Sequence, residues 1–490
     1  MKLRVTQRYL WLPVHKDAKA QKLHFYADGE KFNELDVKLD VSHPAHFFAL
    51  DLGRFLGQEI EITGDAAEDV LGQLTCHEDR PDTSCPNRPL LHFTAETGWI
   101  NDPNGLVYAD GVYHLYYQWN PYGTEWGNMH WGHAVSRDLI TWEHRPVALA
   151  PDEFGTVYSG CGWQDREGVA GFGKDALLFY YTAAGGSNQW SIDQGNKHTQ
   201  RLAVSMDGGE TLQKVGTVID HIKGENRDPK VFWHAESGAY ILVLYLDGTE
   251  FAIFRSTDLV HWQESQRFSA ERMWECPGLF ALPVEGKPGE KKWIFWSADG
   301  YYRIGDFDGY GFHAETEVLA GYDTKLGYAA QTFAGVEDRV ISMTWLRTQQ
   351  DAGGFRGMMA IPTELSLKDG PDGLRLCFCP VREFRERLTK VGEVPLVNGY
   401  AEVPLASEPM VIELEVTGET PVLIRVGNTR IHRESTDKPV RVIIDRGIVE
   451  YFIDDGRIYG AFEVEEDILT TEVHVEAECG SVVQCFRCNK

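Results

Sequence analysis

Residues 136–142 read SRDLITW, and residues 256–262 repeat this pattern as STDLVHW. A weaker copy, SMDGG, lies between them at residues 205–209. Each copy follows a stretch rich in aromatic residues and precedes another strand-like stretch. A turn that recurs once per four-stranded unit of roughly 50–70 residues is typical of a β-propeller. The repeat therefore predicts a propeller over residues 89–375 with about five blades, although periodicity alone also allows about four or six.

The stretches around these turns have the composition of short strands. They are rich in aromatic and β-branched residues, and glycine and aspartate turns separate them. Patterns typical of long helices are scarce. Four stretches carry the strand pattern most clearly: Val112–Trp119, Ala176–Tyr181, Tyr240–Tyr245 and Lys292–Trp296. We therefore predict an all-β protein.

The propeller is predicted to have a β-rich neighbour on each side. Residues 1–88 contain short alternating stretches such as Leu35–Val41, which predict a small amino-terminal β domain. This domain ends in a polar, proline-containing linker, Cys76–Pro86, and carries no pattern that suggests catalysis. Residues 376–392 are expected to form a connector, short and helical or irregular, and residues 393–490 alternate again and predict a C-terminal β-sandwich.

The overall charge argues against several classes of partner. The net charge is −27 and no basic run appears, whereas a surface that binds nucleic acid or an anionic membrane needs a basic patch. A neutral ligand such as a sugar fits this charge most easily, while a local basic pocket for a small anion stays open. The amino terminus lacks a secretory pattern, and no run reaches the roughly 18 apolar residues that cross a bilayer. We therefore expect a cytoplasmic protein without a nucleic-acid or membrane partner, provided that Met1 is the natural start.

The cysteines do not predict a metal site. Nine cysteines, an odd number, are spread over the chain, which suits reduced thiols. Cys377 and Cys379 have the period-2 spacing of one strand face, and Cys485 and Cys488 lack a second pair at zinc-site spacing. We therefore predict no metal and no cofactor.

Three acidic residues stand beside prolines or at the start of strand-like stretches. Asp102 lies in the sequence WINDPNG, Asp228 in ENRDP and Glu275 in MWECP. They are far enough apart in the chain to belong to different blades, and ligands of a propeller meet the loops of several blades at its central channel. Taken singly, each acid is more typical of a turn or of a solvated strand edge. Together they predict one acidic site.

Such a group of acids suits one kind of chemistry. Carboxyl groups that share a site shift one another's pKa, so that one keeps its proton near neutral pH while its neighbours are ionised. Glycoside cleavage with retention of configuration uses a carboxylic acid that protonates the leaving oxygen and a carboxylate about 5–5.5 Å away. Arg227 is expected to keep the adjacent carboxylate of Asp228 ionised. The three acids therefore indicate a glycosidase that needs no metal.

Together these motifs resemble those of glycoside hydrolase family 32, which comprises invertases, levanases, inulinases and related β-fructosidases. Residues 99–105 resemble the motif W-M-N-D-P-N-G, with Ile100 in place of methionine, and the RDP and ECP sequences resemble two further motifs of the family. Four more blocks match, at residues 117–121, 126–134, 328–333 and 356–362. The resemblance is strong over residues 90–390, weak over residues 390–490 and absent from the first domain.

The resemblance implies a five-bladed propeller followed by a β-sandwich, in agreement with the interpretation of the repeat. It also implies that Asp102 is the nucleophile that forms a fructosyl-enzyme, that Glu275 is the general acid/base and that Asp228 stabilises the transition state. A further set is implied to bind the terminal fructose: Asn101, Gln118, Trp126, Ser159 and Arg227. Asp299 and Tyr302 are weaker candidates for substrate binding, because residues 298–300 are equally typical of a turn.

From this resemblance we expect a retaining, exo-acting β-fructofuranosidase that acts on sucrose, fructo-oligosaccharides or the ends of levan and inulin. A sucrose-6-phosphate hydrolase and a transfructosylating enzyme are alternatives that use the same carboxyl groups. A non-catalytic fructan-binding propeller is disfavoured, because all three acids are present. The sequence leaves open whether the first domain packs on the propeller, mediates a homo-oligomer or extends the substrate cleft.

Overall fold

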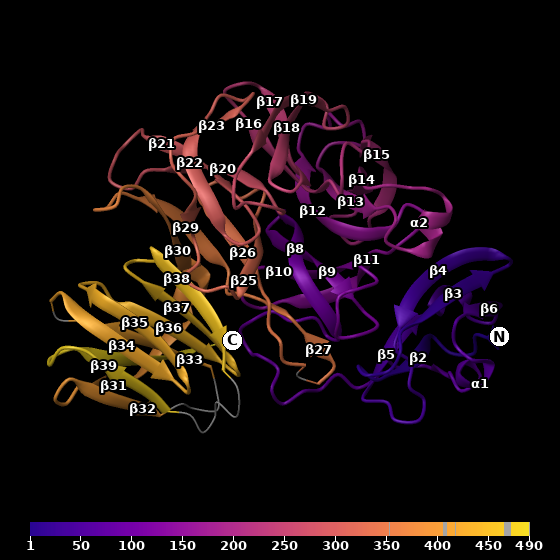
Figure 1. Cartoon of the computed structure of the whole chain (residues 1–490), viewed down its shortest axis with the longest axis horizontal. Helices are drawn as coiled ribbons and strands as arrows, with labels where there is room; N and C mark the ends of the chain where they lie inside the picture. The colour runs from indigo at the N-terminus through magenta and orange to yellow at the C-terminus, as the bar shows by residue number, and fades with distance from the viewer. Residues whose placement is uncertain (352, 405–408, 417, 465–471, 490) are drawn as a thin grey trace.

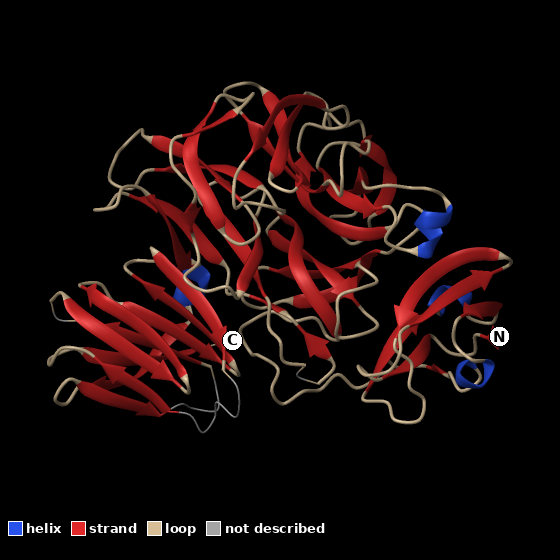
Figure 2. Ribbon diagram, in the orientation of Figure 1, coloured by secondary structure: helices blue, strands red, loops and turns tan. Residues whose placement is uncertain are grey.

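The computed structural model describes residues 1–351, 353–404, 409–416, 418–464 and 472–489. Within them nearly all regular structure is β-strand, and the helices are short (Figures 1 and 2). These helices are α1 (Glu68–Leu71), α2 (Gln189–Asp193), α3 (Arg382–Glu386) and the 3-10 helix η1 (Gly53–Phe55). None of the described helices is long and apolar enough to span a bilayer. The prediction of an all-β protein is confirmed.

The amino-terminal region consists of two small antiparallel sheets that enclose an apolar core of their own. Alternate side chains point inward from both sheets, among them Leu12, Phe25 and Phe48, and Tyr122 of the central region joins this core. The first sheet has the order β1 (Lys2–Arg4), β6 (Glu59–Gly64), β3 (Gln21–Ala27) and β4 (Glu30–Val37). The second sheet has the order β5 (His46–Asp51), β2 (Tyr9–Val14) and β7 (Cys76–His77).

Five sheets follow one another along the described residues of the central region. The first contains β11 (Glu143–Leu149), β10 (His130–Ser136), β9 (Val112–Asn120), β8 (Gly98–Ala109) and the short parallel strand β27 (Phe355–Arg356). The second contains β12 (Thr156–Asp165), β13 (Ala176–Ala184), β14 (Thr199–Ser205) and β15 (Gln213–Ile219). The third contains β16 (Arg227–His234), β17 (Ala239–Asp247), β18 (Glu250–Ser256) and β19 (Gln263–Ser269).

The fourth and fifth sheets complete the central region. The fourth contains β20 (Gly278–Pro283), β21 (Lys291–Trp296), β22 (Tyr301–Phe307), β23 (Phe312–Ala314) and β24 (Leu319–Ala320). The fifth contains β25 (Gly327–Thr332), β26 (Val340–Leu346), β28 (Met358–Met359), β29 (Thr363–Lys368) and β30 (Arg375–Pro380). The first strands of several sheets meet at the centre, because β12 contacts both β8 and β16, and β25 of the last sheet contacts β8 of the first. Residues far apart in the chain therefore come together there.

The repeated SxDL sequence forms the same turn in two sheets. In both copies a serine hydroxyl donates to the aspartate, and the aspartate accepts from the backbone N–H groups two and three residues later. Leu139 and Leu259 follow the aspartates with φ near +63° and +64°, a left-handed conformation that these hydrogen bonds hold. The turns connect β10 to β11 and β18 to β19. The sequence repeat therefore marks the connection between the last two strands of a sheet.

The C-terminal region is a sandwich of two antiparallel sheets. One has the order β31 (Leu388–Pro395), β40 (Val482–Cys488), β33 (Met410–Glu415), β36 (Val440–Asp445), β37 (Ile448–Ile453) and β38 (Ile458–Glu463). The other has the order β32 (Tyr400–Pro404), β39 (Glu472–Glu476), β34 (Thr420–Val426) and β35 (Thr429–Thr436). Phe452 and Tyr459 pack in one cluster with Leu115 and Ile294, so this region shares an apolar core with the central sheets. The sandwich and the amino-terminal region flank different sides of the central sheets (Figure 1).

The central region ends later than the sequence suggests. β30 pairs with β29 along its whole length, so the last sheet extends to Pro380 rather than to residue 375. The connector is correspondingly short, since α3 follows at once and β31 begins at Leu388. Leu376 and Phe378 are buried strand residues of the shared core. The alternation of apolar and polar residues in β30 is short, so the sequence pattern alone does not distinguish this strand from a connector.

A buried ionic group joins the central region to the sandwich. The two ring nitrogens of His92 lie 3.0 Å from Asp445 Oδ2 and 2.9 Å from Glu450 Oε1, and all three side chains are fully buried. Backbone N–H groups of Leu90 and Leu91 also donate to Asp445. These two carboxylates outweigh the effect of burial and raise the pKa of His92 from 6.5 to about 9. The imidazolium is therefore the cation that pairs with both carboxylates at neutral pH.

Replacement of His92 by glutamine is expected to cost roughly 3–5 kcal/mol of unfolding free energy, because two buried carboxylates lose their cation. The folded protein holds this proton more tightly than the unfolded chain, so the stabilisation is complete below about pH 6.5 and is lost as the pH rises through about 9. Denaturant unfolding of the native protein across this range should show that loss, and His92→Gln should not.

The exposed His313 provides the control, since its ring is 66% exposed. His313→Gln should unfold like the native protein at every pH. Equal pH dependence in the native protein and His92→Gln would mean that His92 is not protonated in the fold.

Candidate active site

Each of the three predicted acids lies in, or just before, the first strand of its sheet. Asp102 is in β8, Asp228 is in β16, and Glu275 immediately precedes β20. The pairing register of β8 shifts between Ile100 and Pro103, and that of β16 shifts between Arg227 and Lys230. Proline has no N–H to donate to a sheet, so the prolines that follow both aspartates favour these irregularities. The shifts turn the aspartates out of the regular alternation.

The backbone at two of the acids has an unusual conformation. The φ angles of Asp228, Glu275 and Cys276 are +64°, +53° and +42°, in the left-handed region that non-glycine residues rarely adopt. Such conformations persist where surrounding contacts hold them, and they are frequent at functional sites. Gly105, at the end of the WINDPNG sequence, has a φ of +56°, and a Cβ there would lie 2.6 Å from the Tyr116 ring. Glycine is therefore required at that position.

Asp102 is held by hydrogen bonds to both carboxyl oxygens. The hydroxyl of Ser159, on β12, donates to Oδ2 at 2.5 Å, and the amide of Asn101 donates to Oδ1 at 3.0 Å. The indole N–H of Trp99 in turn donates to Asn101 at 3.0 Å. Burial raises the pKa of Asp102, these hydrogen bonds oppose that effect, and the charge of Glu275 adds to it. The carboxylate is thus oriented on both sides and close to a second acid.

Asp228 lies deeper, with 5% of its side chain exposed. Its backbone N–H donates to the Thr182 hydroxyl at 3.1 Å, and its Oδ2 accepts from the Cys276 N–H at 3.0 Å. Burial raises the pKa of Asp228 to about 7, the neighbouring Arg227 works in the opposite direction, and the charges of Asp102 and Glu275 raise it further. This carboxyl group therefore titrates near neutral pH.

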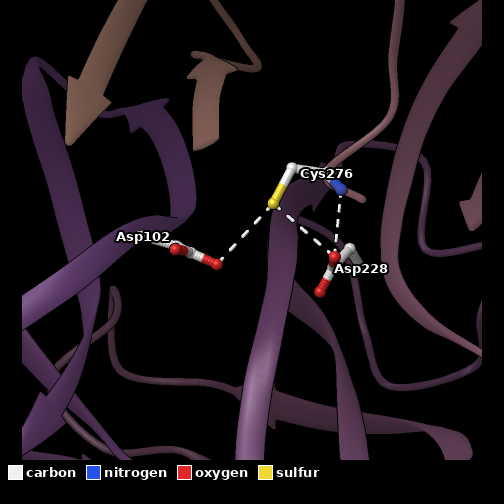
Figure 3. A group of neighbouring side chains, drawn as sticks. All are labelled: Asp102, Asp228 and Cys276. Carbon is white, nitrogen blue, oxygen red and sulfur yellow. Dashed lines mark hydrogen bonds between the residues drawn. The ribbon is translucent and has the colours of Figure 1, made fainter. Parts of the chain in front are cut away.

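Cys276 bridges the two aspartates (Figure 3). Its thiol lies 3.6 Å from Asp102 Oδ2 and 3.5 Å from Asp228 Oδ2. The three side chains offer one ligand atom each within 4.8 Å of one another, which is a spacing that a metal ion can use. Burial and both carboxylates raise the pKa of the thiol well above its usual range, so it keeps its proton and donates to the carboxylates. The donor set fits this hydrogen-bonded state better than thiolate coordination of a metal.

Glu275 is fixed by a cation and a phenol. Arg227 Nη2 donates to Glu275 Oε1 at 2.6 Å, and the Tyr328 hydroxyl donates to Oε2 at 2.5 Å. Arg227 Nε also lies 3.9 Å from Asp228 Oδ2 and its guanidinium stacks over the ring of Tyr245 at 4.7 Å, so one guanidinium serves two acids. The Trp274 indole donates to the Tyr328 hydroxyl at 3.1 Å. Glu275 remains 28% exposed and is more accessible than Asp228.

Two further predicted residues border this group. Gln118 is buried on β9, and its amide donates to the backbone carbonyl of Val157 at 2.9 Å, two residues before Ser159. Trp126 is 58% exposed, and its ring meets the edge of Tyr158 at a centroid distance of 5.9 Å. Trp126 therefore presents an exposed aromatic side chain next to Tyr158, the residue before Ser159.

Of the two weaker candidates, Asp299 lies near the acids and Tyr302 does not. Asp299 lies near Glu275, whose charge contributes to raising the pKa of Asp299, and Asp299 Oδ1 is 3.4 Å from Arg347 Nη2. Tyr302 is only 1% exposed and belongs to the apolar core, where its hydroxyl accepts from the Leu376 N–H at 3.0 Å. The structure does not bring Tyr302 to the acids, because its side chain fills the space between the fourth and fifth sheets.

Sequence reasoning did not assign a role to Cys276 or Tyr328, although both directly contact the acids. Both lie inside stretches that carry the resemblance, ECP and residues 328–333. Cysteine and tyrosine are common core residues, so position in a motif was the only signal available. The structure assigns them to the site through their hydrogen bonds.

Comparisons with known proteins agree with this geometry. Residues 92–380 match the family model described as the N-terminal domain of glycosyl hydrolases family 32. The levanase of Bacillus subtilis (strain 168) is 38% identical over 329 residues, which are 61% of this chain and 47% of that protein. The invertase of Debaryomyces hansenii is 37% identical over 299 residues, which are 55% of this chain and 54% of that protein. The chain thus spans about half the length of these curated relatives.

A solved structure extends the match to the fold. The structure of fructofuranosidase from Schwanniomyces occidentalis complexed with fructose superimposes with a TM-score of 0.71 and 25% identity, and the alignment covers 84% of this chain and 99% of that one. The matched region contains all three acids with their Arg227, Ser159 and Tyr328 partners. This chain therefore belongs to glycoside hydrolase family 32.

Proposed function

We propose that the protein is a retaining, exo-acting β-fructofuranosidase that releases terminal β-D-fructofuranosyl units from sucrose, fructo-oligosaccharides or fructan ends. The observation that carries the proposal is the meeting of Asp102, Asp228 and Glu275 from three sheets around Cys276 and Arg227. The names of the relatives, a levanase and an invertase, support a fructoside as the substrate. We interpret the five central sheets as the blades of one closed propeller.

In the proposed reaction Asp102 attacks the anomeric carbon of the terminal fructose while Glu275 protonates the leaving oxygen. A covalent fructosyl-enzyme forms, and the leaving sugar departs with the proton of Glu275. Glu275, now ionised, then removes a proton from water, which attacks the anomeric carbon and releases Asp102. Two displacements at the same carbon leave its configuration unchanged.

The surrounding hydrogen bonds suit these roles. Ser159 and Asn101 each bind one oxygen of Asp102, which aims the carboxylate, and they release it partly as the covalent bond forms. Arg227 and Tyr328 hold the two oxygens of Glu275 and thereby set the direction of its proton. The proposed role of Asp228 is to accept hydrogen bonds from sugar hydroxyls, which strengthen as positive charge develops on the ring.

The two catalytic acids can be tested separately. Asp102→Asn should lower turnover by on the order of 10⁴-fold, because no covalent intermediate forms. Glu275→Gln should lower turnover of unactivated fructosides by roughly 10²–10⁴-fold, because the leaving oxygen is no longer protonated. Added azide should partly rescue Glu275→Gln on an activated fructoside by forming a fructosyl azide of retained configuration, since azide needs no general base. Fructose release and NMR of the first-formed product measure these effects.

Asp258→Asn, in the surface turn before β19, is the matched control and should leave turnover near the native value. Near-native turnover in Asp102→Asn or Glu275→Gln would overturn the assignment. A first product of inverted configuration from the native enzyme would exclude the retaining mechanism.

The raised pKa of Asp228 has a measurable consequence for stability. The folded protein binds this proton more tightly than the unfolded chain, so the native protein loses stability as the pH rises from about 4 to about 7. Asp228→Asn removes that loss, worth up to about 4 kcal/mol at about 1.4 kcal/mol per pKa unit. The midpoint of thermal unfolding should therefore be higher for Asp228→Asn than for the native protein at about pH 8, and the difference should shrink as the pH falls towards about 4.

Asp258 gives the opposite case, because hydrogen bonds from His261 and Val260 hold the pKa of its carboxyl group below its usual range. Asp258→Asn should lower the midpoint at neutral pH. A constant difference between Asp228→Asn and the native protein across the whole range would contradict a raised pKa at Asp228.

A panel of sucrose, sucrose 6-phosphate, kestose, inulin and levan separates the remaining alternatives. We expect fructose from the neutral substrates in preference to sucrose 6-phosphate, because the guanidinium at the site is already engaged by two acids. Preference for sucrose 6-phosphate would favour the phosphate-specific alternative. Oligosaccharides that grow at high sucrose concentration would favour the transfructosylating alternative, and absence of any fructose release would contradict the proposed function.

A further inference from the structure

A cleft of about 460 Å³ lies between the amino-terminal region and the loop that follows β9. Residues from both regions line it: His15, Lys16 and Ala20 from the amino-terminal region, and Thr124, Trp126 and Ser187 from the central sheets. The family match begins only at residue 92, so one wall of this cleft comes from outside the matched domain. Trp126 belongs to this cleft and also contacts Tyr158, the residue before Ser159.

Polar contacts hold the amino-terminal region in place at this edge. The Asp36 N–H donates to Asn128 Oδ1, and the Asn128 amide returns a hydrogen bond to the Asp36 carbonyl, both at 2.8 Å. Lys38 Nζ lies 2.6 Å from Glu125 Oε2. The buried carboxylate of Glu34 accepts from the Gln189 N–H at 2.6 Å, at the start of α2. The wall of the cleft is therefore positioned relative to the loop that carries Trp126.

Two strands connect the cleft to the acids. On β12, Thr156 lines the cleft and Ser159 binds Asp102. On β9, Asn120 lines the cleft, and Gln118 lies two residues earlier beside Val157. Three strand residues span roughly 10 Å. Thr156, in the wall of the cleft, therefore lies roughly 10 Å along β12 from Ser159, the residue that binds the nucleophile.

The chemistry of the cleft fits a neutral sugar chain. Trp126 offers an exposed aromatic face, and hydroxyl, amide and imidazole groups supply donors and acceptors around it. Lys38 is paired with Glu125, and the charges of Asp36 and Asp351 offset that of Lys16, so the cleft does not favour an anion. In this cleft residues of the amino-terminal region meet residues of β9 and β12, the strands that carry Gln118 and Ser159.

We propose that the amino-terminal region forms the distal part of the substrate site and binds the sugar units beyond the one next to the scissile bond, on the leaving-group side. This inference rests on the proposed function and deepens it. The first region thereby selects longer fructosides over sucrose, because only longer chains reach His15, Lys16 and Ala20. The loss of these contacts affects binding of long chains and leaves the chemistry at Asp102 and Glu275 unchanged.

Two variants test the proposal in the full-length enzyme. Ala20→Trp fills the cleft from its exposed wall, and the double variant His15→Ala/Lys16→Ala removes polar side chains from it. Each should lower kcat/KM for nystose, an inulin-type tetrasaccharide, by about fivefold or more, which is the effect of losing roughly one net hydrogen bond. For sucrose kcat/KM should change by less than about twofold, because that substrate does not reach the cleft. Lys19→Ala, an exposed neighbour outside the lining, is the matched control and should leave both values unchanged.

Calorimetric binding separates failure of this inference from failure of the proposed function. In Asp102→Asn, nystose should bind at least about fivefold more tightly than in Asp102→Asn combined with Ala20→Trp, whether or not the native enzyme cleaves it. Equal losses on sucrose and nystose, or equal nystose affinity with and without Ala20→Trp, would overturn the role of the cleft. Fructose release without any effect of the cleft variants would leave the proposed function standing and remove this inference alone.

Discussion

The convergence of three carboxyl groups on one point is the constraint on which the centre of this protein depends. Burial raises the pKa of Asp102 and Asp228, and the charges of the neighbouring acids raise it further. The guanidinium of Arg227 contacts Glu275 and lies beside Asp228, while neutral donors satisfy the oxygens of Asp102. One cation among three acids leaves a site that holds a proton near neutral pH.

The need to bring these acids together also explains the unusual backbone conformation around them. Left-handed residues and interrupted strand pairing are unfavourable by themselves, and they occur where acids must leave the regular alternation of a strand. The Asp228 N–H donates to the Thr182 hydroxyl, and Asp228 Oδ2 accepts from the Cys276 N–H, so two hydrogen bonds hold this irregular conformation. The inner strands β12, β13 and β17 of the neighbouring sheets are mostly buried, so they supply the rigid frame that such a site requires.

The two flanking regions attach to the central sheets by different means. The C-terminal sandwich shares an apolar core with them and is joined by the buried group of His92, Asp445 and Glu450. Among the described residues, the amino-terminal region takes only Tyr122 of the central region into its core, and polar contacts through Asn128, Lys38 and Gln189 hold it in place. A shared core favours a structural role for the sandwich. A polar edge beside Trp126 is suited to a ligand, which is why the proposed distal binding site lies there.

The sequence by itself determined the all-β class, the recurring turn, the succession of strand-rich regions and the three acids, because each of these depends on residues close together in the chain. The SxDL turn is the clearest case, since its hydrogen bonds join residues at most three positions apart. The tertiary structure decided which polar groups meet. Tyr328 binds Glu275 from 53 positions away and Cys276 lies against Asp102 from 174 positions away, whereas Tyr302 turned out to fill the core. The cleft beside Trp126 likewise exists only because two regions pack together, and no local pattern encodes which long-range surfaces will meet.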